Sequence, residues 1–117
     1  MIQANVVEIG PEAINEKEPM LILFNNTATT TLRNYSIIQE FLNKEPFKLE
    51  SGKTIRFDEQ EYTIEHVGTT ANQNLETVGH VTLVFDEHQP ENTIVNGVYL
   101  NPYQLPEIHL GTQIYYQ

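Results

Sequence analysis

Hydrophobic residues along this chain recur mostly in short runs with a period of two, which is the spacing of β-strands. The pattern predicts strands over residues 2–9, 20–24, 35–42, 54–57, 62–67, 80–85, 93–100 and 111–116. Glycine, proline and asparagine punctuate these segments, as expected for turns. Many short strands joined by turns are typical of a compact barrel or sandwich. We therefore expect one all-β domain over residues 1–117, a small closed or nearly closed β-barrel of about six or more short strands with one short helical turn.

Three stretches depart from this simple alternation. Residues 69–77 are expected to form one or two helical turns, and residues 25–33 a loop or ragged turn. The pair Asn96–Gly97 favours a tight turn that interrupts the strand predicted over residues 93–100.

The segment 35–42 fits two periods. As a strand it would place Ile37, Gln39 and Phe41 on one face, whereas helical spacing would pair Ile37 with Phe41. We favour the strand because the run Tyr-Ser-Ile-Ile has β character.

The predicted core follows from alternation in the clearest strands. In the strand over residues 80–85, one face carries Val81, Leu83 and Phe85, and the opposite face carries His80, Thr82 and Val84. In the hairpin, Ile55 and Ile64 point inward, and alternation places His66 on the same side as Ile64, in the core or at its rim. We expect Val81, Leu83, Phe85, Ile55 and Ile64 to be buried.

Composition narrows the classes of partner. The formal net charge is −10, from sixteen acidic and six basic residues. Such a charge argues against nucleic acid and against anionic membrane surfaces, and it favours a basic protein partner. The chain has no cysteine, which excludes disulfides and zinc–thiolate sites. With no apolar stretch of membrane-spanning length and no signal-peptide pattern, we expect a soluble, cytoplasmic protein without direct membrane insertion.

The most specific motif is Asn-Leu-Glu-Thr-Val-Gly-His-Val-Thr-Leu-Val-Phe-Asp over residues 74–86. It resembles the N-L-x-x-x-G-H-V-T-L-x-F-D signature of the glucitol/sorbitol-specific enzyme IIA family of the phosphoenolpyruvate-dependent sugar phosphotransferase system. The resemblance implies a cytoplasmic β-barrel that takes a phosphoryl group from the histidine phosphocarrier protein and passes it to the sugar-specific IIB/IIC membrane component. It implies no diffusible cofactor.

The resemblance also implies a phosphohistidine in a Tyr-x-Phe/Ile-Ile-His arrangement. The matching stretch here is Tyr-Ser-Ile-Ile-Gln, so Gln39 occupies the acceptor position. An amide nitrogen cannot accept a phosphoryl group because its lone pair is delocalised into the carbonyl. The first histidine in the chain is His66, so no small shift of register supplies one.

His80 is the next candidate for the acceptor. Gly79 beside it would let a phosphoryl group approach the backbone, and Thr82 on the same strand face could donate to a phosphoryl oxygen. A strand-entry histidine bonded to a nearby carbonyl is the structural alternative, and His80 could also support an acceptor at position 39. On either account we expect Gln39 at the surface near His80.

The remaining histidines, His66, His88 and His109, have weaker contexts, and we expect no metal site around His88 because adjacent loop residues rarely provide a full ligand set. Two other functions stay open. One is a IIA-like binding or regulatory module that has lost phosphoryl transfer, which Gln39 favours. The other is a small ligand-binding barrel that shares only the family's fold, with tyrosines such as Tyr99 and Tyr103 lining its pocket.

Overall fold

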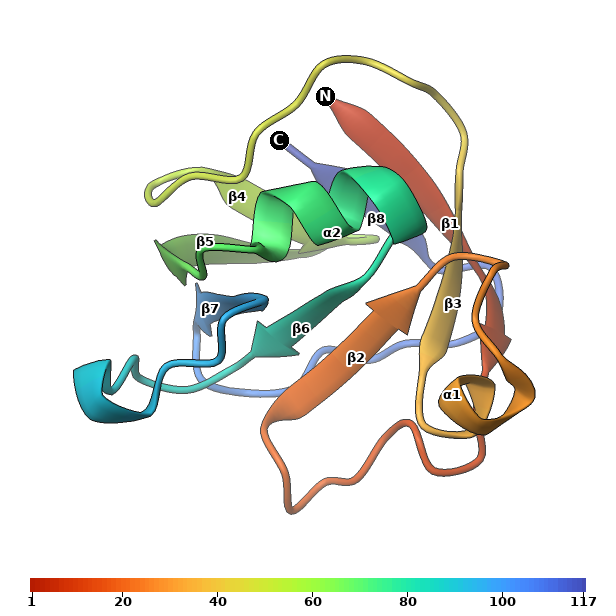
Figure 1. The fold of residues 1–117 in the computed structure, drawn as a ribbon, viewed down its shortest axis with the longest axis horizontal. Helices are drawn as coiled ribbons and strands as arrows, with labels where there is room; N and C mark the ends of the chain where they lie inside the picture. The colour runs from red at the N-terminus through yellow and green to blue at the C-terminus, as the bar shows by residue number, and fades with distance from the viewer.

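Eight strands close into a barrel in the computed structural model, which describes residues 1–117 (Figure 1). The strands are β1 (Ile2–Ile9), β2 (Met20–Phe24), β3 (Ile37–Phe41), β4 (Thr54–Phe57), β5 (Gln60–Val67), β6 (Val81–Val84), β7 (Gly97–Asn101) and β8 (Gln113–Tyr116). Two helices, α1 (Thr30–Asn34) and α2 (Ala71–Val78), and the 3₁₀ turn Pro90–Asn92 lie in the connections. The predicted all-β barrel is confirmed.

The strands follow the order β1-β3-β2-β6-β7-β5-β4-β8, and β8 pairs with β1 to close the barrel. The pairs β2–β3 and β6–β7 are parallel, and the other neighbours are antiparallel. Strand β6 therefore lies between β2 and β7, which come from distant parts of the sequence. This arrangement brings residues near positions 24 and 96 to either side of the β6 entrance.

The core confirms the alternation in the clearest strands. Val81, Leu83, Phe85, Ile55 and Ile64 all belong to one buried cluster. Residues Thr82 and Val84 lie on the opposite side of β6, and they too are largely covered. The wall of the barrel is therefore packed on both sides of this strand.

Two element predictions need correction. Residues 30–34 form helix α1 rather than a loop, because Thr29 caps the helix by accepting the Leu32 N–H at 3.3 Å. Strand β7 begins only at Gly97, so residues 93–96 are not strand. There the N–H of Gly97 donates to the Ile94 carbonyl in a turn. The helix expected over residues 69–77 is confirmed as α2.

A register shift in β5 overturns the expected direction of His66. The pairing of β5 with β7 is irregular between Ile64 and His66, which offsets the alternation by one residue. Val67 then packs against the core, and the His66 ring lies near Tyr99 instead. Tyr99 alternates with the core residues on β7, so His66 lies on the outer side of the wall.

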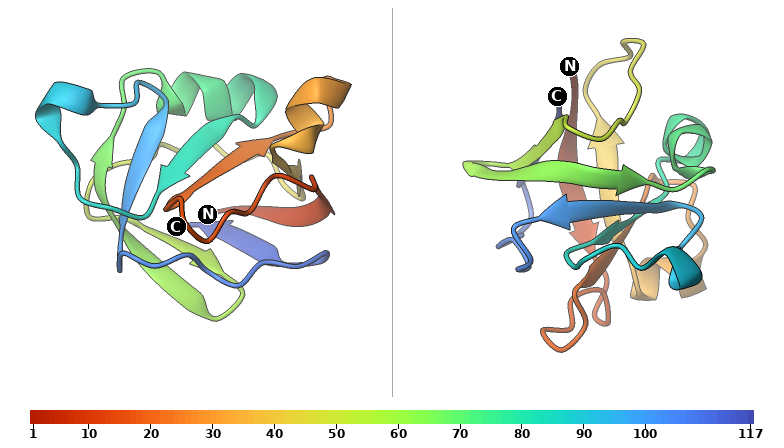
Figure 2. Two further views of the ribbon diagram at one scale, coloured as in Figure 1. Left: turned by 90° about the horizontal axis from the view of Figure 1, so that it is seen from below. Right: turned by 90° about the vertical axis from the view of Figure 1, so that its left-hand side faces the viewer.

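The long connection between β3 and β4 arches over the end of the barrel at which both termini lie (Figures 1 and 2). Its residue Leu49 inserts into the core and is 1% exposed. The Asn72 side chain of α2 accepts the Leu49 N–H at 2.6 Å and donates to the Leu49 carbonyl at 3.1 Å. This connection therefore covers one end of the barrel and is fastened to α2.

Candidate functional site

Helix α2 leads into β6 through Gly79, which ends the helix in the left-handed conformation (φ 60°, ψ 25°). This helix ending favours glycine. A Cβ at this position would also lie 2.9 Å from the Cβ of Asn25 and 3.2 Å from the Phe41 ring. Position 79 therefore favours glycine both because the backbone is left-handed there and because a side chain would have no room. The turn at Gly79 places His80 directly before β6.

The His80 imidazole lies on the outer side of the barrel wall. It stacks on Phe24, with ring centroids 4.0 Å apart and planes at 12°. Phe24 is partly exposed, whereas its neighbour Leu23 points into the core and is 0% exposed. The His80 ring is itself only partly buried. One face of the ring is therefore covered by an aromatic side chain close to solvent.

Hydrogen bonds fix the protonation pattern of this ring. His80 Nδ1 lies 3.1 Å from the Leu23 carbonyl oxygen, and Nε2 lies 2.6 Å from Asn96 Nδ2. A carbonyl oxygen can only accept, so Nδ1 carries the proton and donates, and the Asn96 amide donates to Nε2. Of the two neutral tautomers of the ring, these contacts fit the one with the proton on Nδ1 and the lone pair on Nε2. The contact with the Leu23 carbonyl is the one that the structural alternative for His80 predicts.

Thr82 lies beside this group but contacts Asn96. Its N–H donates to the Asn96 carbonyl at 3.1 Å, and its hydroxyl lies 3.5 Å from Asn96 Oδ1. The structure therefore brings His80, Gly79 and Thr82 together, with Asn96 between the imidazole and the hydroxyl.

Gln39 does not lie at the surface, and this prediction is wrong. Its side chain is 0% exposed. Its amide donates to the Gly79 carbonyl at 3.0 Å, and its carboxamide oxygen accepts the Tyr116 hydroxyl at 2.6 Å. The same alternation that pairs Gln39 with the core residue Ile37 explains this inward direction.

Gln39 and His80 consequently do not form one two-residue site. Gln39 bonds the fully buried Tyr116 inside the barrel, whereas His80 stacks on Phe24 outside it. Burial raises the pKa of the Tyr116 phenol, and the hydrogen bond to Gln39 opposes that shift only in part. The phenol therefore stays protonated and keeps donating to Gln39. The backbone of Gly79, whose carbonyl accepts from Gln39, leads directly into His80.

A shallow hollow of about 210 Å³ lies on the outer surface beside position 39, bordered by Asn25, Asn26, Thr27, Gln39, Glu40 and Phe41. Arg33 holds its loop in place. The guanidinium donates to the carbonyls of Ala28 and Asn26 and pairs with Glu8 at 3.0 Å. Most of the lining residues are of polar type, but the surface that they expose to the hollow is largely apolar.

His66 and His88 stack on each other, with ring centroids 3.7 Å apart and planes at 9°. Tyr99 packs its ring edgewise against both, and His88 Nε2 lies 2.7 Å from the Thr93 hydroxyl. Burial, and then the neighbouring His88, lower the pKa of His66. This pair fastens the connection after β6 to the outer wall, away from the His80 contacts.

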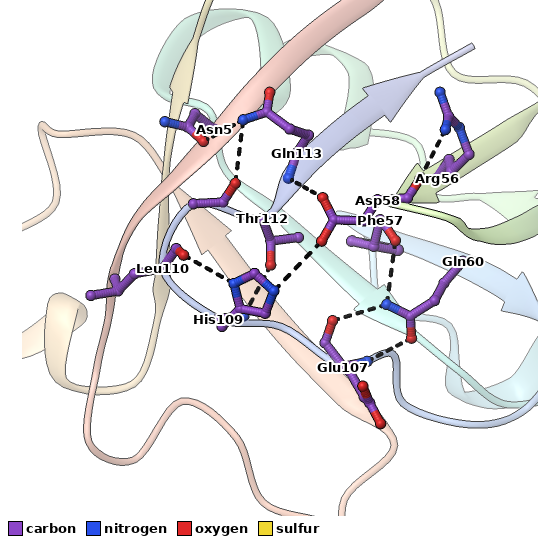
Figure 3. Close-up of polar contacts among 11 residues, drawn as sticks. Asn5, Arg56, Phe57, Asp58, Gln60, Glu107, His109, Leu110, Thr112 and Gln113 are labelled. Atoms are coloured by element: carbon purple, nitrogen blue, oxygen red, sulfur yellow. Dashed lines mark hydrogen bonds and ion pairs between the residues drawn. The ribbon is translucent and has the colours of Figure 1, made fainter.

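His109 lies in a separate network at the β4–β5 turn (Figure 3). Its Nδ1 lies 3.0 Å from the Leu110 carbonyl, and its Nε2 lies 3.7 Å from Asp58 Oδ2. Asp58 in turn accepts the Gln113 N–H at 2.9 Å. His109 is well exposed, so the network organises a surface turn.

No group of three or more histidine, aspartate or glutamate side chains is placed to hold a metal ion. No helix is long and apolar enough to cross a lipid bilayer.

The sequence did not point to Asn96, Phe24 or the Leu23 carbonyl as partners of His80. In the sequence, the pair Asn96–Gly97 indicates only a tight turn. Its contact with His80 depends on the parallel pairing of β6 with β7, which places Thr82 opposite Gly97. Strand order of this kind has no local pattern in the sequence.

Comparisons with known proteins agree with this architecture. Residues 1–115 match the family described as the PTS system glucitol/sorbitol-specific IIA component. The glucitol/sorbitol-specific EIIA component of the PTS system of Escherichia coli (strain K12) is 33% identical over 85 residues, which cover 72% of this chain and 68% of that protein. The crystal structure of a PTS system IIA component from Enterococcus faecalis V583 superposes with a TM-score of 0.92 at 45% identity, covering 97% of this chain and 98% of the other.

Proposed function

The chain belongs to the glucitol/sorbitol-specific IIA family of the sugar phosphotransferase system, and we propose that it relays a phosphoryl group there through His80. The donor is the histidine phosphocarrier protein, and the receivers are the sugar-specific IIB/IIC components for glucitol/sorbitol uptake. The observation that carries the proposal is the fixed tautomer of His80, whose Nδ1 donates to Leu23 and whose lone pair lies on Nε2.

The transfer follows from this geometry. The lone pair of Nε2 forms a P–N bond while the P–N bond of the phosphocarrier's phosphohistidine breaks, and the electron pair of that bond returns to the phosphocarrier's imidazole. The proton on Nδ1 stays in its hydrogen bond to the Leu23 carbonyl, which stabilises positive charge on the phosphorylated ring. The same exchange in reverse delivers the group to the next component. Positioning and electrostatics supply most of the catalysis in such transfers.

The overall charge supports protein partners of the opposite sign. With a formal net charge of −10, the chain attracts a basic partner surface and repels free anions. A phosphoryl group is therefore better delivered by a docked protein than by a small phosphate compound. Such partners place the protein in the cytoplasm, where we expect it to work.

The test is incubation with phosphoenolpyruvate, enzyme I and the histidine phosphocarrier protein, followed by intact-mass measurement. Wild type is expected to gain one phosphoryl group that is labile in acid and stable in alkali, and His80→Ala is expected to gain none. His109→Ala, a change at an exposed histidine in another network, is the matched control and should be labelled like wild type. Full labelling of His80→Ala would contradict the proposed acceptor.

A second function is favoured by one observation, the buried carboxamide at position 39. The family resemblance implies an acceptor histidine there, and Gln39 has both polar atoms engaged with Gly79 and Tyr116. A IIA-like binding or regulatory module that has lost transfer would dock with the same partners and carry no phosphoryl group.

The same assay separates the two functions. A relay that labels another IIA component of the family but not this wild-type chain would favour the regulatory module, provided that binding to the phosphocarrier is still detected by calorimetry. Gln39→His would then be examined for labelling at position 39, which borders the outer hollow.

A further inference from the structure

Asn96 is the only side chain in hydrogen-bond contact with His80 Nε2. Its backbone is held independently of that contact, because its carbonyl accepts the Thr82 N–H at 3.1 Å and the next residue, Gly97, donates to the Ile94 carbonyl at 2.9 Å. The side chain therefore extends from a fixed point of the β6–β7 wall. Its 2.6 Å contact with Nε2 is short for a hydrogen bond between two nitrogens.

The direction of each hydrogen bond follows from the Leu23 carbonyl. That oxygen only accepts, so Nδ1 donates, Nε2 accepts, and Asn96 must present its NH₂ group to the ring. The side-chain oxygen of Asn96, Oδ1, then points to the Thr82 hydroxyl, 3.5 Å away, which can donate to it. From the Leu23 carbonyl through the His80 ring and the Asn96 amide to the Thr82 hydroxyl, each donor therefore faces an acceptor.

These hydrogen bonds affect the tautomer of His80, because a histidine side chain free in water exchanges its proton between the two ring nitrogens. The Leu23 carbonyl selects the Nδ1–H form, and a donor at Nε2 selects the same form from the other side of the ring. An amide N–H that donates to a lone pair before transfer can donate to a phosphoryl oxygen once the P–N bond has formed, with a small side-chain rotation. A single side chain can thus serve the ring in both states.

We propose that Asn96 has two roles: it positions the lone pair of His80 at Nε2 in the free protein, and it then acts as a catalytic residue by donating to the bound phosphoryl group. Nothing in the amino-acid pattern assigns either role, since the Asn96–Gly97 pair has the composition of an ordinary turn. The second role rests on the proposed relay through His80. The first role concerns the free protein alone.

The test begins with the free protein at a pH near 8, where ¹⁵N shifts of the His80 ring distinguish the protonated from the unprotonated nitrogen. Wild type is expected to show a single tautomer with the proton on Nδ1. Asn96→Ala should shift both ring nitrogens toward the averaged values of a tautomer mixture. Asn92→Ala, at an exposed asparagine in the same connection, should match wild type. Ring shifts unchanged in Asn96→Ala would overturn the positioning role.

The second measurement is the rate of labelling by the phosphocarrier. Asn96→Ala should lower it by about 100-fold, the scale expected for removing one donor to a developing charge, whereas Asn92→Ala should leave it unchanged. A normal rate in Asn96→Ala would overturn the donation to the phosphoryl group. Failure of wild type to be labelled by a competent relay would refute the relay and this donation together, and the nitrogen shifts would still decide the tautomer role.

Discussion

The polar clusters on the two sides of Gly79 have similar chemistry but different access to solvent. Inside the barrel, Gln39 joins the Gly79 carbonyl to the Tyr116 hydroxyl with no exposed surface. Outside, His80 joins the Leu23 carbonyl to Asn96 and remains partly exposed. Each cluster bridges two chain segments through one planar side chain.

Because the two clusters differ in burial, substitutions in them should have different effects, on folding in the inner cluster and on the chemistry of the His80 ring in the outer one. A buried polar group that loses its partner pays its full desolvation cost, so the inner cluster should affect folding strongly. The outer cluster can replace lost partners with water, so changes there should affect folding less and the chemistry of the ring more.

The largest effect on folding is expected for Gln39→Leu. The change keeps the volume but leaves the Tyr116 hydroxyl and the Gly79 carbonyl without their buried partner, which should lower the free energy of unfolding by about 3 kcal/mol. Urea unfolding measures it, and Gln104→Leu at an exposed glutamine should change it by less than about 0.5 kcal/mol. Equal effects at the two positions would contradict the structural role of the inner cluster.

The next largest effect concerns the junction itself. Gly79→Ala combines a positive φ with a methyl group 2.9 Å from the Asn25 Cβ, and should cost about 2 kcal/mol of unfolding free energy. Gly52→Ala is the matched control because Gly52 has φ 92° and no heavy atom within 4 Å of an added Cβ. Its cost should be only the backbone strain, about 1 kcal/mol. If the two variants unfold alike, crowding at Gly79 is unimportant.

The smallest effect is expected on the outer wall, at His66. Its pKa is lowered by burial and then by His88, so the unfolded chain binds the proton more tightly. The stability contribution is therefore complete above the unfolded pKa of about 6.5 and is lost as the pH falls through that value toward the lower folded pKa.

We expect a loss of at most about 0.5 kcal/mol between neutral pH and pH near 5, because solvent screens this partly exposed pair. His66→Phe keeps an aromatic ring against His88 and should remove this part of the pH dependence, as measured by urea unfolding at the two pH values. His109→Gln should leave the dependence on His66 intact. A pH profile unchanged in His66→Phe would show that the stacked pair does not contribute.

The alternation of hydrophobic residues predicted the barrel and its core because each strand's face is decided locally. The same alternation places Gln39 on the buried face with Ile37. We nevertheless expected Gln39 at the surface, because the resembling family has its acceptor histidine at this position. The direction of His66 could not be predicted in the same way, since the irregular pairing after Ile64 arises between β5 and β7. Asn96 was missed for a related reason, because its contact with His80 depends on which strands become neighbours.

Closure of the barrel by β1 and β8 has a consequence for how the chain folds. Residues 2–5 pair with residues 113–116, so the last contacts of the sheet join segments that are almost a full chain length apart. Contacts of such long range slow folding, because the entropy of closing the loop is lost before the pairing is gained. Until they form, β1 and β8 each present an open edge that can pair with another molecule, whereas the finished barrel has none. Aggregation should therefore compete mainly during refolding, and it should increase with protein concentration there while the native protein stays unaffected.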